Sequence, residues 1–263
     1  MLYDMHCHLD FSDEGPSIAR SMAGLVSAFS ATVDPDRFDR AIGRLACAPQ
    51  VRVGLGLHPW QALSPHFDGQ VERFVARAAA CPFVGEVGID FSPRRLQTRE
   101  AQMRAFDRVV RALVEGDSSF ASGIVSIHAV HAADEAIDAF ERCGATARSR
   151  FAQPASASGR ALVLHSFAGT SDQLHRAIEA GFFFSVGSRM LAAKRGRAYV
   201  RAIPVERLLL ETDMPAHEGD SFSADVWRDS LESSLAALAE VRGDDVETLR
   251  AVLSATSARI LGV

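Results

Sequence analysis

The 263-residue sequence has only four cysteines, and no two of them form a CxxC pair. Cysteines scattered in this way indicate neither a disulfide framework nor a cysteine-bound zinc site. No apolar run approaches the roughly 18 residues that a membrane-spanning helix requires. The opening MLYDMHCHLD does not have the basic and apolar segments of a secretory signal. These absences predict a cytoplasmic protein with no membrane partner.

An excess of basic residues is also absent. There are 28 Lys and Arg against 33 Asp and Glu, which gives a formal net charge of −5. Proteins that hold duplex DNA through many phosphates usually present a basic face, because counterion release supplies most of the non-specific affinity. The charge therefore argues against a broad nucleic-acid groove. It does not exclude phosphoester chemistry, since a bound metal ion attracts a phosphate locally.

What the sequence does contain is an alternation of short apolar runs with longer segments of helical period. Eight runs have the length of strands, and most are rich in Val, Ile, Leu or Phe. They occupy residues 1–6, 24–30, 51–58, 82–90, 123–128, 161–167, 181–187 and 207–213. Between them, apolar residues recur three and four positions apart, which is typical of amphipathic helices. Clear examples are residues 34–48, 70–80, 99–116, 132–144 and 171–181.

Continuous apolar strands that alternate with helices indicate a parallel sheet covered by helices. Eight such strands in a chain of this length predict an α/β fold, a single (β/α)₈ TIM barrel that spans residues 1–263. Residues 145–160 are rich in Ala and Ser and have no clear period. They predict a surface insertion before the sixth strand rather than a linker between domains.

The residues with metal-binding or acid–base side chains stand at, or just past, the C-terminal ends of the apolar runs. In a TIM barrel all eight of these ends meet at one face, where such enzymes keep their active sites. The sequence therefore predicts a metal site at the C-terminal ends of the strands. The candidate ligands are His6, His8, Glu86, His128, His165 and Asp213.

His6 and His8 have the two-residue period of a strand, so their side chains point to the same side. Two such imidazoles can bind one divalent ion, although an exposed polar strand end gives the same pattern. His128 and His165 also end apolar runs, and this repetition favours the metal interpretation.

Two carboxylates complete the set and are also the candidate catalytic residues. Glu86 lies inside the apolar run VGEVGID, where a charge must be paired or metal-bound because an isolated buried charge is too costly. A salt bridge to Arg94 or Arg95 is the alternative. Asp213 follows LLLET, and its possible roles are metal ligand, general base or helix cap.

Imidazole and carboxylate ligands together suit Zn²⁺, Mn²⁺, Fe²⁺ or Ni²⁺ better than Ca²⁺, with Mg²⁺ also considered. Six ligands exceed what one four-coordinate ion needs, so two divalent ions bridged by a carboxylate are expected. A centre of this kind lowers the pKa of bound water and stabilises charge on a substrate oxygen, which predicts a hydrolase.

Several segments resemble the motifs of TatD-family metal-dependent hydrolases, a branch of the amidohydrolase-like barrels. Residues 3–9, YDMHCHL, resemble the DxHxHL opening of the family. Four later segments match in order: 56–59 resemble GxHP, 84–91 GEIGLDY, 164–169 HxFxG and 210–215 ETDxP. The matches extend across nearly the whole chain.

The resemblance implies two metal ions with Glu86 between them. His6, His8 and Asp213 would complete the first site, and His128 and His165 the second. It also implies hydrolysis of phosphodiester bonds, with deoxyribonuclease activity the best-known assignment of the family. Amide, lactone or carboxyl-ester hydrolysis at the same centre is the alternative, and a non-catalytic metal-binding scaffold is a third hypothesis.

The chain departs from the family's pattern in one position that bears on the substrate. The family commonly continues the histidine of its fifth strand with Ser-Arg-Asp-Ala, whereas His128 is followed by AVHA, which places Val130 where an arginine is usual. An arginine there would hold a phosphate, and valine offers no such grip. Small phosphodiesters or short oligonucleotides are therefore expected as substrates rather than long DNA.

Three further residues are candidate substrate contacts. His58 would contact the substrate or act as a secondary acid, and a structural hydrogen bond is the alternative. Lys194 begins a basic run that could bind phosphate, although such runs are usually solvated. Phe167, together with Trp60, would form an apolar or stacking wall, with ordinary packing as the alternative.

Overall fold

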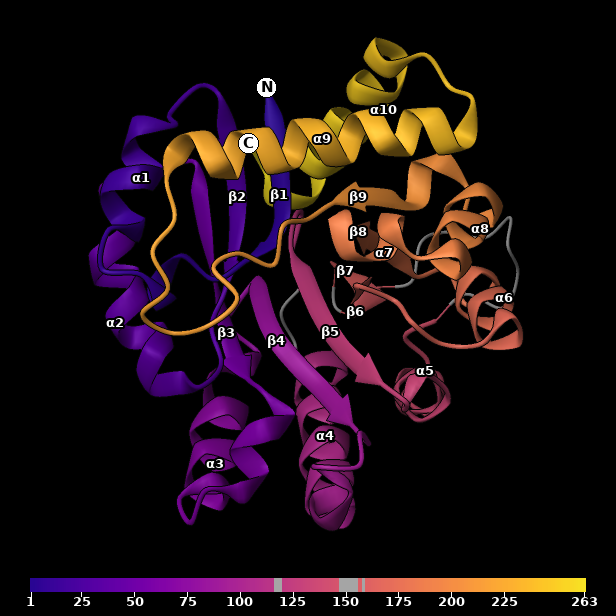
Figure 1. Cartoon of the computed structure of the whole chain (residues 1–263). Coiled ribbons are helices and arrows are strands. Elements are labelled where there is room, and N and C mark those ends of the chain that lie inside the picture. The colour runs from indigo at the N-terminus through magenta and orange to yellow at the C-terminus, as the bar shows by residue number, and fades with distance from the viewer. Residues whose placement is uncertain (116–119, 147–155, 158) are drawn as a thin grey trace.

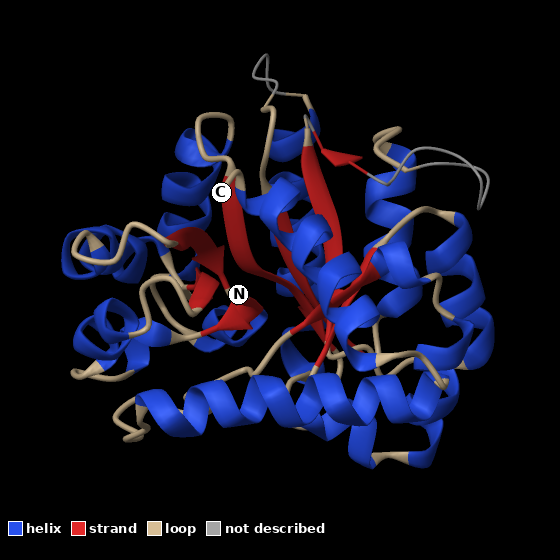
Figure 2. Ribbon diagram, turned by 90° about the horizontal axis from the view of Figure 1, so that it is seen from above, coloured by secondary structure: helices blue, strands red, loops and turns tan. Residues whose placement is uncertain are grey.

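We describe residues 1–115, 120–146, 156–157 and 159–263 from a computed structural model of the chain. Eight parallel strands in these ranges alternate with helices and form a nearly closed barrel, which confirms the predicted TIM barrel (Figures 1 and 2). Neighbouring strands follow the chain order. They are β1 (Leu2–Cys7), β2 (Val26–Ala31), β3 (Val51–Leu57), β4 (Phe83–Asp90), β5 (Ile124–Val130), β7 (Arg160–His165), β8 (Phe183–Val186) and β9 (Leu208–Leu210).

Helices surround the strands on the outside of the barrel (Figure 2). The α-helices are α1 (Gly15–Ser21), α2 (Pro35–Leu45), α3 (Phe67–Ala78), α4 (Arg99–Val114), α5 (Ala133–Arg142), α6 (Ser171–Glu179), α7 (Ser188–Ala192), α8 (Lys194–Ala202), α9 (Ala224–Arg242) and α10 (Val246–Leu261). The 3₁₀ helices are η1 (Leu9–Phe11), η2 (Pro59–Leu63), η3 (Leu96–Thr98) and η4 (Val205–Arg207). Several helices begin where a side chain caps the first turn, as Asp34 does for α2 and Thr170 for α6.

The barrel closes between its last strand and its first through the segment that follows β9. The amide of Thr212 donates to the Asp4 carboxylate at 3.1 Å, and the amide of Asp213 donates to the His6 carbonyl at 2.9 Å. One step further, the His8 amide donates to the Met214 carbonyl at 2.8 Å. These bonds hold Asp213 directly beside the histidines of β1.

A bulge in β1 turns the two histidines into the barrel. The pairing of β1 with β2 shifts register between Asp4 and Cys7. Before the shift, Met5 packs in a cluster with residues of β2, β5, β7 and β8, which marks the barrel interior. After it, the ring of His6 reaches Ser126 of β5, while Cys7 packs in the outer core. One extra residue therefore moves the side-chain alternation so that His6 and His8 face inward.

Gly88 allows β4 and β5 to pass close together next to the site. A Cβ atom on this residue would lie 2.0 Å from the carbonyl oxygen of His128, and its φ is +152°. Any side chain would therefore push these strands apart. The glycine keeps Glu86 of β4 within reach of His128 of β5.

Part of the predicted insertion at 145–160 lies outside the described residues. Of its described part, residues 156–157 form the short strand β6 (Ser156–Ala157), which pairs antiparallel with β7. In the described ranges, a membrane span is not found among the helices, because none combines the necessary length and hydropathy.

Candidate metal centre

The structure brings the six predicted metal ligands together at the C-terminal ends of the strands. The four histidines lie at or near the C-terminal ends of their strands, Glu86 lies within β4, and Asp213 lies three residues beyond β9. Five of the six are less than a tenth exposed. Those five are His6, His8, Glu86, His128 and His165; Asp213, after β9, is the exception, with a side chain 28% exposed. The cluster therefore reaches solvent on the side of Asp213.

Three donor atoms, from His6, His8 and Asp213, form a first group with the Oε2 atom of Glu86. The Nε2 atoms of His6 and His8 lie 3.3 Å apart, and each lies 3.5 Å from Glu86 Oε2. They lie 3.7 Å and 3.4 Å from Asp213 Oδ1. A tetrahedral ion with ligand bonds of about 2.1 Å separates its ligands by about 3.4 Å. These atoms already have the mutual spacing of a metal site.

A second group surrounds the other oxygen of the same carboxylate. Glu86 Oε1 lies 2.7 Å from His128 Nδ1 and 2.9 Å from His165 Nε2. The two nitrogens are 3.4 Å apart. The Nε2 atom of His58 lies 3.3 Å from the same oxygen, so His58 stands among these donors as well as near any bound substrate. Glu86 is therefore placed to link two sites.

Hydrogen bonds orient the first two imidazoles. His8 Nδ1 lies 3.1 Å from the carbonyl of Ala31, which can only accept, so Nδ1 carries a proton and Nε2 is the nitrogen that faces the first group. His6 Nδ1 is 2.7 Å from the hydroxyl of Ser126. Phe11 stacks on the His8 ring with 4.6 Å between centroids. These contacts aim both Nε2 atoms at the first group, as partners of metal ligands commonly do.

The two carboxylates are held in their ionised form. Burial alone would raise the pKa of Glu86, but the imidazoles of His58, His165 and His128 hold it well below its ordinary value. Burial also opposes ionisation of Asp213, but its hydrogen bond to His8 and the other imidazoles lower its pKa. Ionised carboxylates are the form that binds divalent ions.

The structure also argues against one alternative for each of these carboxylates: an arginine salt bridge for Glu86 and a helix cap for Asp213. Among the described residues, the ion pairs of Glu86 are with imidazoles rather than with Arg94 or Arg95. Asp213 caps no helix, since the next helix, α9, is capped by Ser223. Its backbone has the left-handed φ of 58°, a strained conformation that is common at functional sites.

Sequence reasoning missed three buried acids that support the ligands. Asp4 accepts hydrogen bonds from Thr212 and from Trp227 Nε1, and burial raises its pKa to about 7. Glu211 Oε2 lies 3.6 Å from His165 Nδ1 and accepts a bond from the Ser185 hydroxyl. The signal for Asp4 and Glu211 was their place inside the quoted motifs, two residues from a ligand.

The third acid, Asp90, joins the second group to an exposed ring. Its Oδ2 atom lies 3.4 Å from His128 Nε2 and 2.6 Å from Trp60 Nε1. Asp90 ends β4, so its position at a strand end was the available signal.

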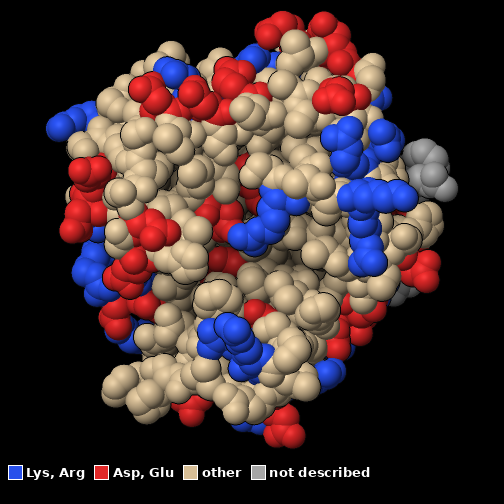
Figure 3. Space-filling view, in the orientation of Figure 1, with Lys and Arg blue, Asp and Glu red and all other residues tan. Residues whose placement is uncertain are grey.

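The other two predicted substrate contacts, Phe167 and Lys194, lie in different environments. Phe167 is 4% exposed and packs edge-on against Phe184, which favours the packing interpretation. Lys194 is an exposed residue at the start of α8, whereas Arg189 is the basic residue that reaches Asp213, at 4.0 Å. Figure 3 shows a hollow near the centre of the face in view, with acidic atoms inside it and basic side chains beside it. The roles of Phe167 and Lys194 in substrate binding stay predictions.

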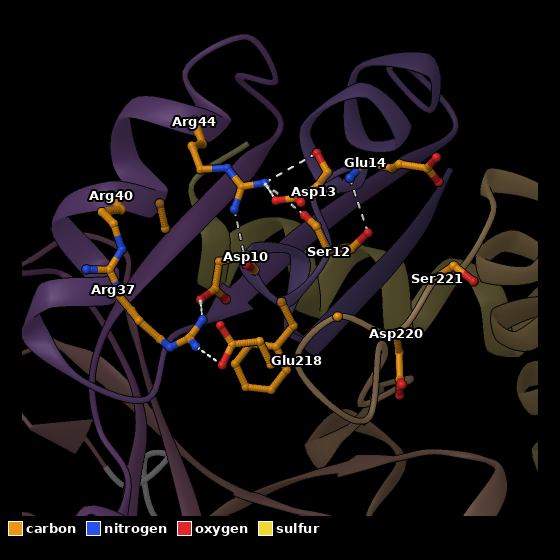
Figure 4. Close-up of a pocket in the computed structure, with 13 residues that line it drawn as sticks. Asp10, Ser12, Asp13, Glu14, Arg37, Arg40, Arg44, Glu218, Asp220 and Ser221 are labelled. Carbon is orange, nitrogen blue, oxygen red and sulfur yellow. Dashed lines mark hydrogen bonds and ion pairs between the residues drawn. The ribbon is translucent and has the colours of Figure 1, made fainter.

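A cavity of about 390 Å³ lies beside the centre, between the segment after β1, helix α2 and residues 218–221 (Figure 4). Arg44 donates to the carbonyls of Asp10 and Ser12, and Arg37 pairs with Asp10 and Glu218. Acidic residues outnumber arginines in its lining, so it does not suit a phosphate. The arginines hold the loop that carries Phe11 against His8.

A barrel with buried imidazoles and carboxylates gathered at its strand ends defines the class of metal-dependent hydrolases. Comparison with known protein families narrows this class. The model of the family described as TatD related DNase matches residues 3–262, and the chain belongs to that family.

Several curated relatives match over nearly their whole length. The human protein named deoxyribonuclease TATDN3 is 24% identical, with 94% of this chain and 89% of the relative covered. The metal-dependent hydrolase YjjV of Escherichia coli, described as uncharacterized, is 26% identical, with 95% and 93% covered. The 3'-5' ssDNA/RNA exonuclease TatD of Citrobacter koseri is 25% identical, with 94% and 90% covered.

A solved structure supports the fold. The crystal structure of the Escherichia coli TatD homologue YjjV superposes with a TM-score of 0.77 at 23% identity, and the match covers 100% of this chain and 98% of that one.

Proposed function

We propose that this protein is a divalent-metal-dependent hydrolase that cleaves phosphodiester bonds in nucleic acids. One observation carries the metal chemistry: the donor atoms of His6, His8, Glu86 and Asp213 have the mutual spacing of ligands around one ion. The names of its relatives, a deoxyribonuclease and an ssDNA/RNA exonuclease, support nucleic acid as the substrate.

We assign two ions to the centre. His6, His8 and Asp213 would hold the first together with Glu86 Oε2, and His128 and His165 the second with Glu86 Oε1. Bound ions would lower the pKa of a water molecule and neutralise charge on the phosphoryl oxygen. Zn²⁺, Mn²⁺, Fe²⁺ or Ni²⁺ suit this donor set, with Mg²⁺ also admissible.

The chain's own residues supply proton transfer and positioning. Asp213 is the one ligand with a substantially exposed side chain, and its low pKa keeps it ready to accept a hydrogen bond from the attacking water. Glu86 is buried and holds both groups at a fixed separation. Arg189, beside Asp213, is placed to meet a phosphate from the solvent side.

The test combines metal analysis with a substrate panel. The wild-type protein, purified with divalent metal present, should contain close to two ions per chain. It should cleave a small chromogenic phosphodiester and a short single-stranded oligonucleotide, and a chelator should abolish both activities. The double variant His6→Ala/His8→Ala should lose metal and activity, whereas His66→Ala, an exposed histidine, should keep both.

Two results would contradict the proposal. Full activity in the presence of chelator would exclude the metal role. Efficient turnover of a lactone or amide panel, with no cleavage of either phosphodiester, would show that the same centre serves a different electrophile.

A further inference from the structure

Trp60 differs from every other aromatic side chain that the structure describes, because it alone is exposed. Its relative exposure is 49%, whereas the second tryptophan, Trp227, is fully buried. An exposed indole offers a large apolar face and one polar N–H, a combination that is enriched where proteins contact other molecules. Phe167, the other half of the wall expected from the sequence, lies in the core. The structure thus separates two residues that the sequence grouped together.

The exposed indole is fixed to the metal centre rather than free to move. Its Nε1 donates to Asp90 Oδ2 at 2.6 Å, and the same oxygen lies 3.4 Å from His128 Nε2. The other oxygen of Asp90 accepts the amide of Ser92 at 2.8 Å, so the carboxylate is itself anchored. The His58 ring meets the indole edge-on at 4.9 Å between centroids. These contacts hold Trp60 beside the second group of ligands.

The chemistry around the ring suits a nucleotide. The guanidinium of Arg95 lies over the ring, with its Cζ atom 4.7 Å from the centroid. A π surface with an adjacent guanidinium offers one partner for a base and another for its phosphate. Leu63, at the end of the same 3₁₀ helix η2, is also about half exposed and extends an apolar rim.

We propose that Trp60, backed by Asp90 and flanked by Arg95, is a stacking platform for the nucleobase next to the bond that is cleaved. This inference rests on the proposed function and adds to it a base-binding subsite. It predicts a substrate preference for unpaired strands, because a base inside a duplex does not present its face to a side chain. Stacking is tolerant of base identity, so little sequence preference is expected.

The first experiment measures binding without turnover. A thymidine tetranucleotide is titrated into the full-length protein in chelator while tryptophan fluorescence is recorded, with a tetranucleotide whose sugars are abasic as the control probe. Because Trp227 is buried, Trp60 is the ring that a stacked base can quench. We expect saturable quenching by the thymidine probe and none by the abasic probe, and no quenching in Trp60→Phe.

The second experiment measures turnover of the two tetranucleotides by the metal-loaded protein. Trp60→Ala should lower kcat/KM for the base-bearing substrate about five- to ten-fold, towards the low end of the effect of removing a stacking ring, and leave the abasic substrate within about two-fold. Trp60→Phe keeps an aromatic face but loses the bond to Asp90, and should lose less than about three-fold. Leu25→Ala, which truncates a similarly exposed apolar side chain just before β2, at the opposite end of the strands, should change neither substrate.

The outcomes separate the two proposals. An equal loss on both substrates in Trp60→Ala would show that Trp60 acts by positioning Asp90 and His128, which overturns the base subsite. Equal quenching by both probes, or by neither, also overturns it. A wild-type protein that hydrolyses neither tetranucleotide would overturn the proposed function, while the fluorescence titration would still decide whether a base stacks on Trp60.

Discussion

Strand β7 carries a buried basic side chain at each end, and the hydrogen-bond partners of these two side chains differ. At its start, Arg160 is fully buried and donates to the carbonyls of Cys81, Leu113 and Ala78 at 2.7 to 3.2 Å. At its finish, His165 lies 2.9 Å from the Glu86 carboxylate and 3.6 Å from that of Glu211, and its Nδ1 atom has no hydrogen-bond partner among the described residues.

The partners explain the difference. Main-chain carbonyls at the ends of α3 and α4 satisfy Arg160 at fixed positions, so this residue ties helices to the barrel. Burial lowers the pKa of Arg160 to about 10, which leaves it charged at neutral pH. The carboxylates beside His165 need a positive charge to balance them, which either a proton on the imidazole or a bound metal ion can supply. We therefore expect the Arg160 end of the strand to serve stability and the His165 end to serve the metal binding proposed above.

The largest expected effect tests the binding end. Glu86→Gln preserves shape but removes the charge that links the two groups. We expect metal content to fall at both sites and activity to fall by at least about 1,000-fold, since each ten-fold corresponds to only 1.36 kcal/mol of barrier. The metal-free variant should unfold at the same temperature as the wild type, within a few degrees.

Glu72→Gln is the matched control, because Glu72 is exposed and pairs only with surface Arg108 among the contacts that the structure defines. It should retain metal and activity. Substantial activity with full metal content in Glu86→Gln would show that this carboxylate does not bridge the sites.

The second effect tests the stabilising end. Arg160→Met keeps much of the side-chain volume but leaves buried carbonyls without their donor, which costs about 1–3 kcal/mol for each group that water does not reach. We expect the free energy of unfolding, measured by denaturant titration, to fall by about 3 kcal/mol. Activity per folded molecule should not change.

Arg104→Met, an exposed arginine on α4, should shift the unfolding free energy by less than about 0.5 kcal/mol. If Arg160→Met instead lowered kcat at full stability, the division of β7 into a stabilising end and a binding end would be wrong.

The strands and helices were predictable from the sequence because they follow a local periodicity of apolar residues. Apolar runs gave the strands, and three- and four-residue spacing gave the helices between them. The rule that strand ends meet at one face then brought His6, Glu86 and His165 together without any coordinates. Local pattern and the geometry of one fold were sufficient for this.

The rest depends on residues that are distant in the chain. Asp4 bonds to Trp227 across 223 positions, and nothing near either residue indicates the contact. The bulge in β1 that turns His6 inward leaves no mark in the alternation of the sequence. Whether Phe167 or Trp60 is exposed is decided by which helices cover each ring. These features follow from packing, which local pattern does not encode.

A smaller effect concerns pH. Burial disfavours protonation of His165, but the carboxylates of Glu86 and Glu211 outweigh it and raise its pKa well above the ordinary value. The proton must leave before a metal ion binds, so apparent metal affinity should fall about ten-fold per unit as pH drops below this raised pKa. The free energy of unfolding of the metal-free protein should depend on pH in the opposite direction. The stabilisation that His165 contributes is fully present below the pKa of this residue in the unfolded chain, and it is lost as the pH rises through the raised pKa of the folded protein.

Thermal unfolding across a pH series, with and without metal, measures both slopes. Glu211→Gln removes one of the two carboxylates that raise the pKa of His165, so the pH range over which both effects appear should narrow and move to lower pH. Parallel slopes with and without metal would contradict a shared role for proton and ion at the binding end.

The smallest effect concerns Val130, which lies at the edge of the proposed metal centre. Val130 ends β5 opposite Asp90 of β4 and is partly exposed. The wild type should bind DNA with only a shallow dependence on salt, because few phosphates are neutralised.

Val130→Arg places a permanent charge with two parallel donors on the strand position paired with Asp90, which itself contacts His128. Single-stranded DNA should then bind about three- to five-fold tighter at low salt, with the slope of log K against log salt steeper by about 0.7, the value for one added phosphate contact. Val130→Leu is the control for side-chain size, and neither variant should alter unfolding. A wild type that already binds long DNA tightly, with a steep salt slope, would place the phosphate grip elsewhere, with Arg189 beside Asp213 the first residue to replace.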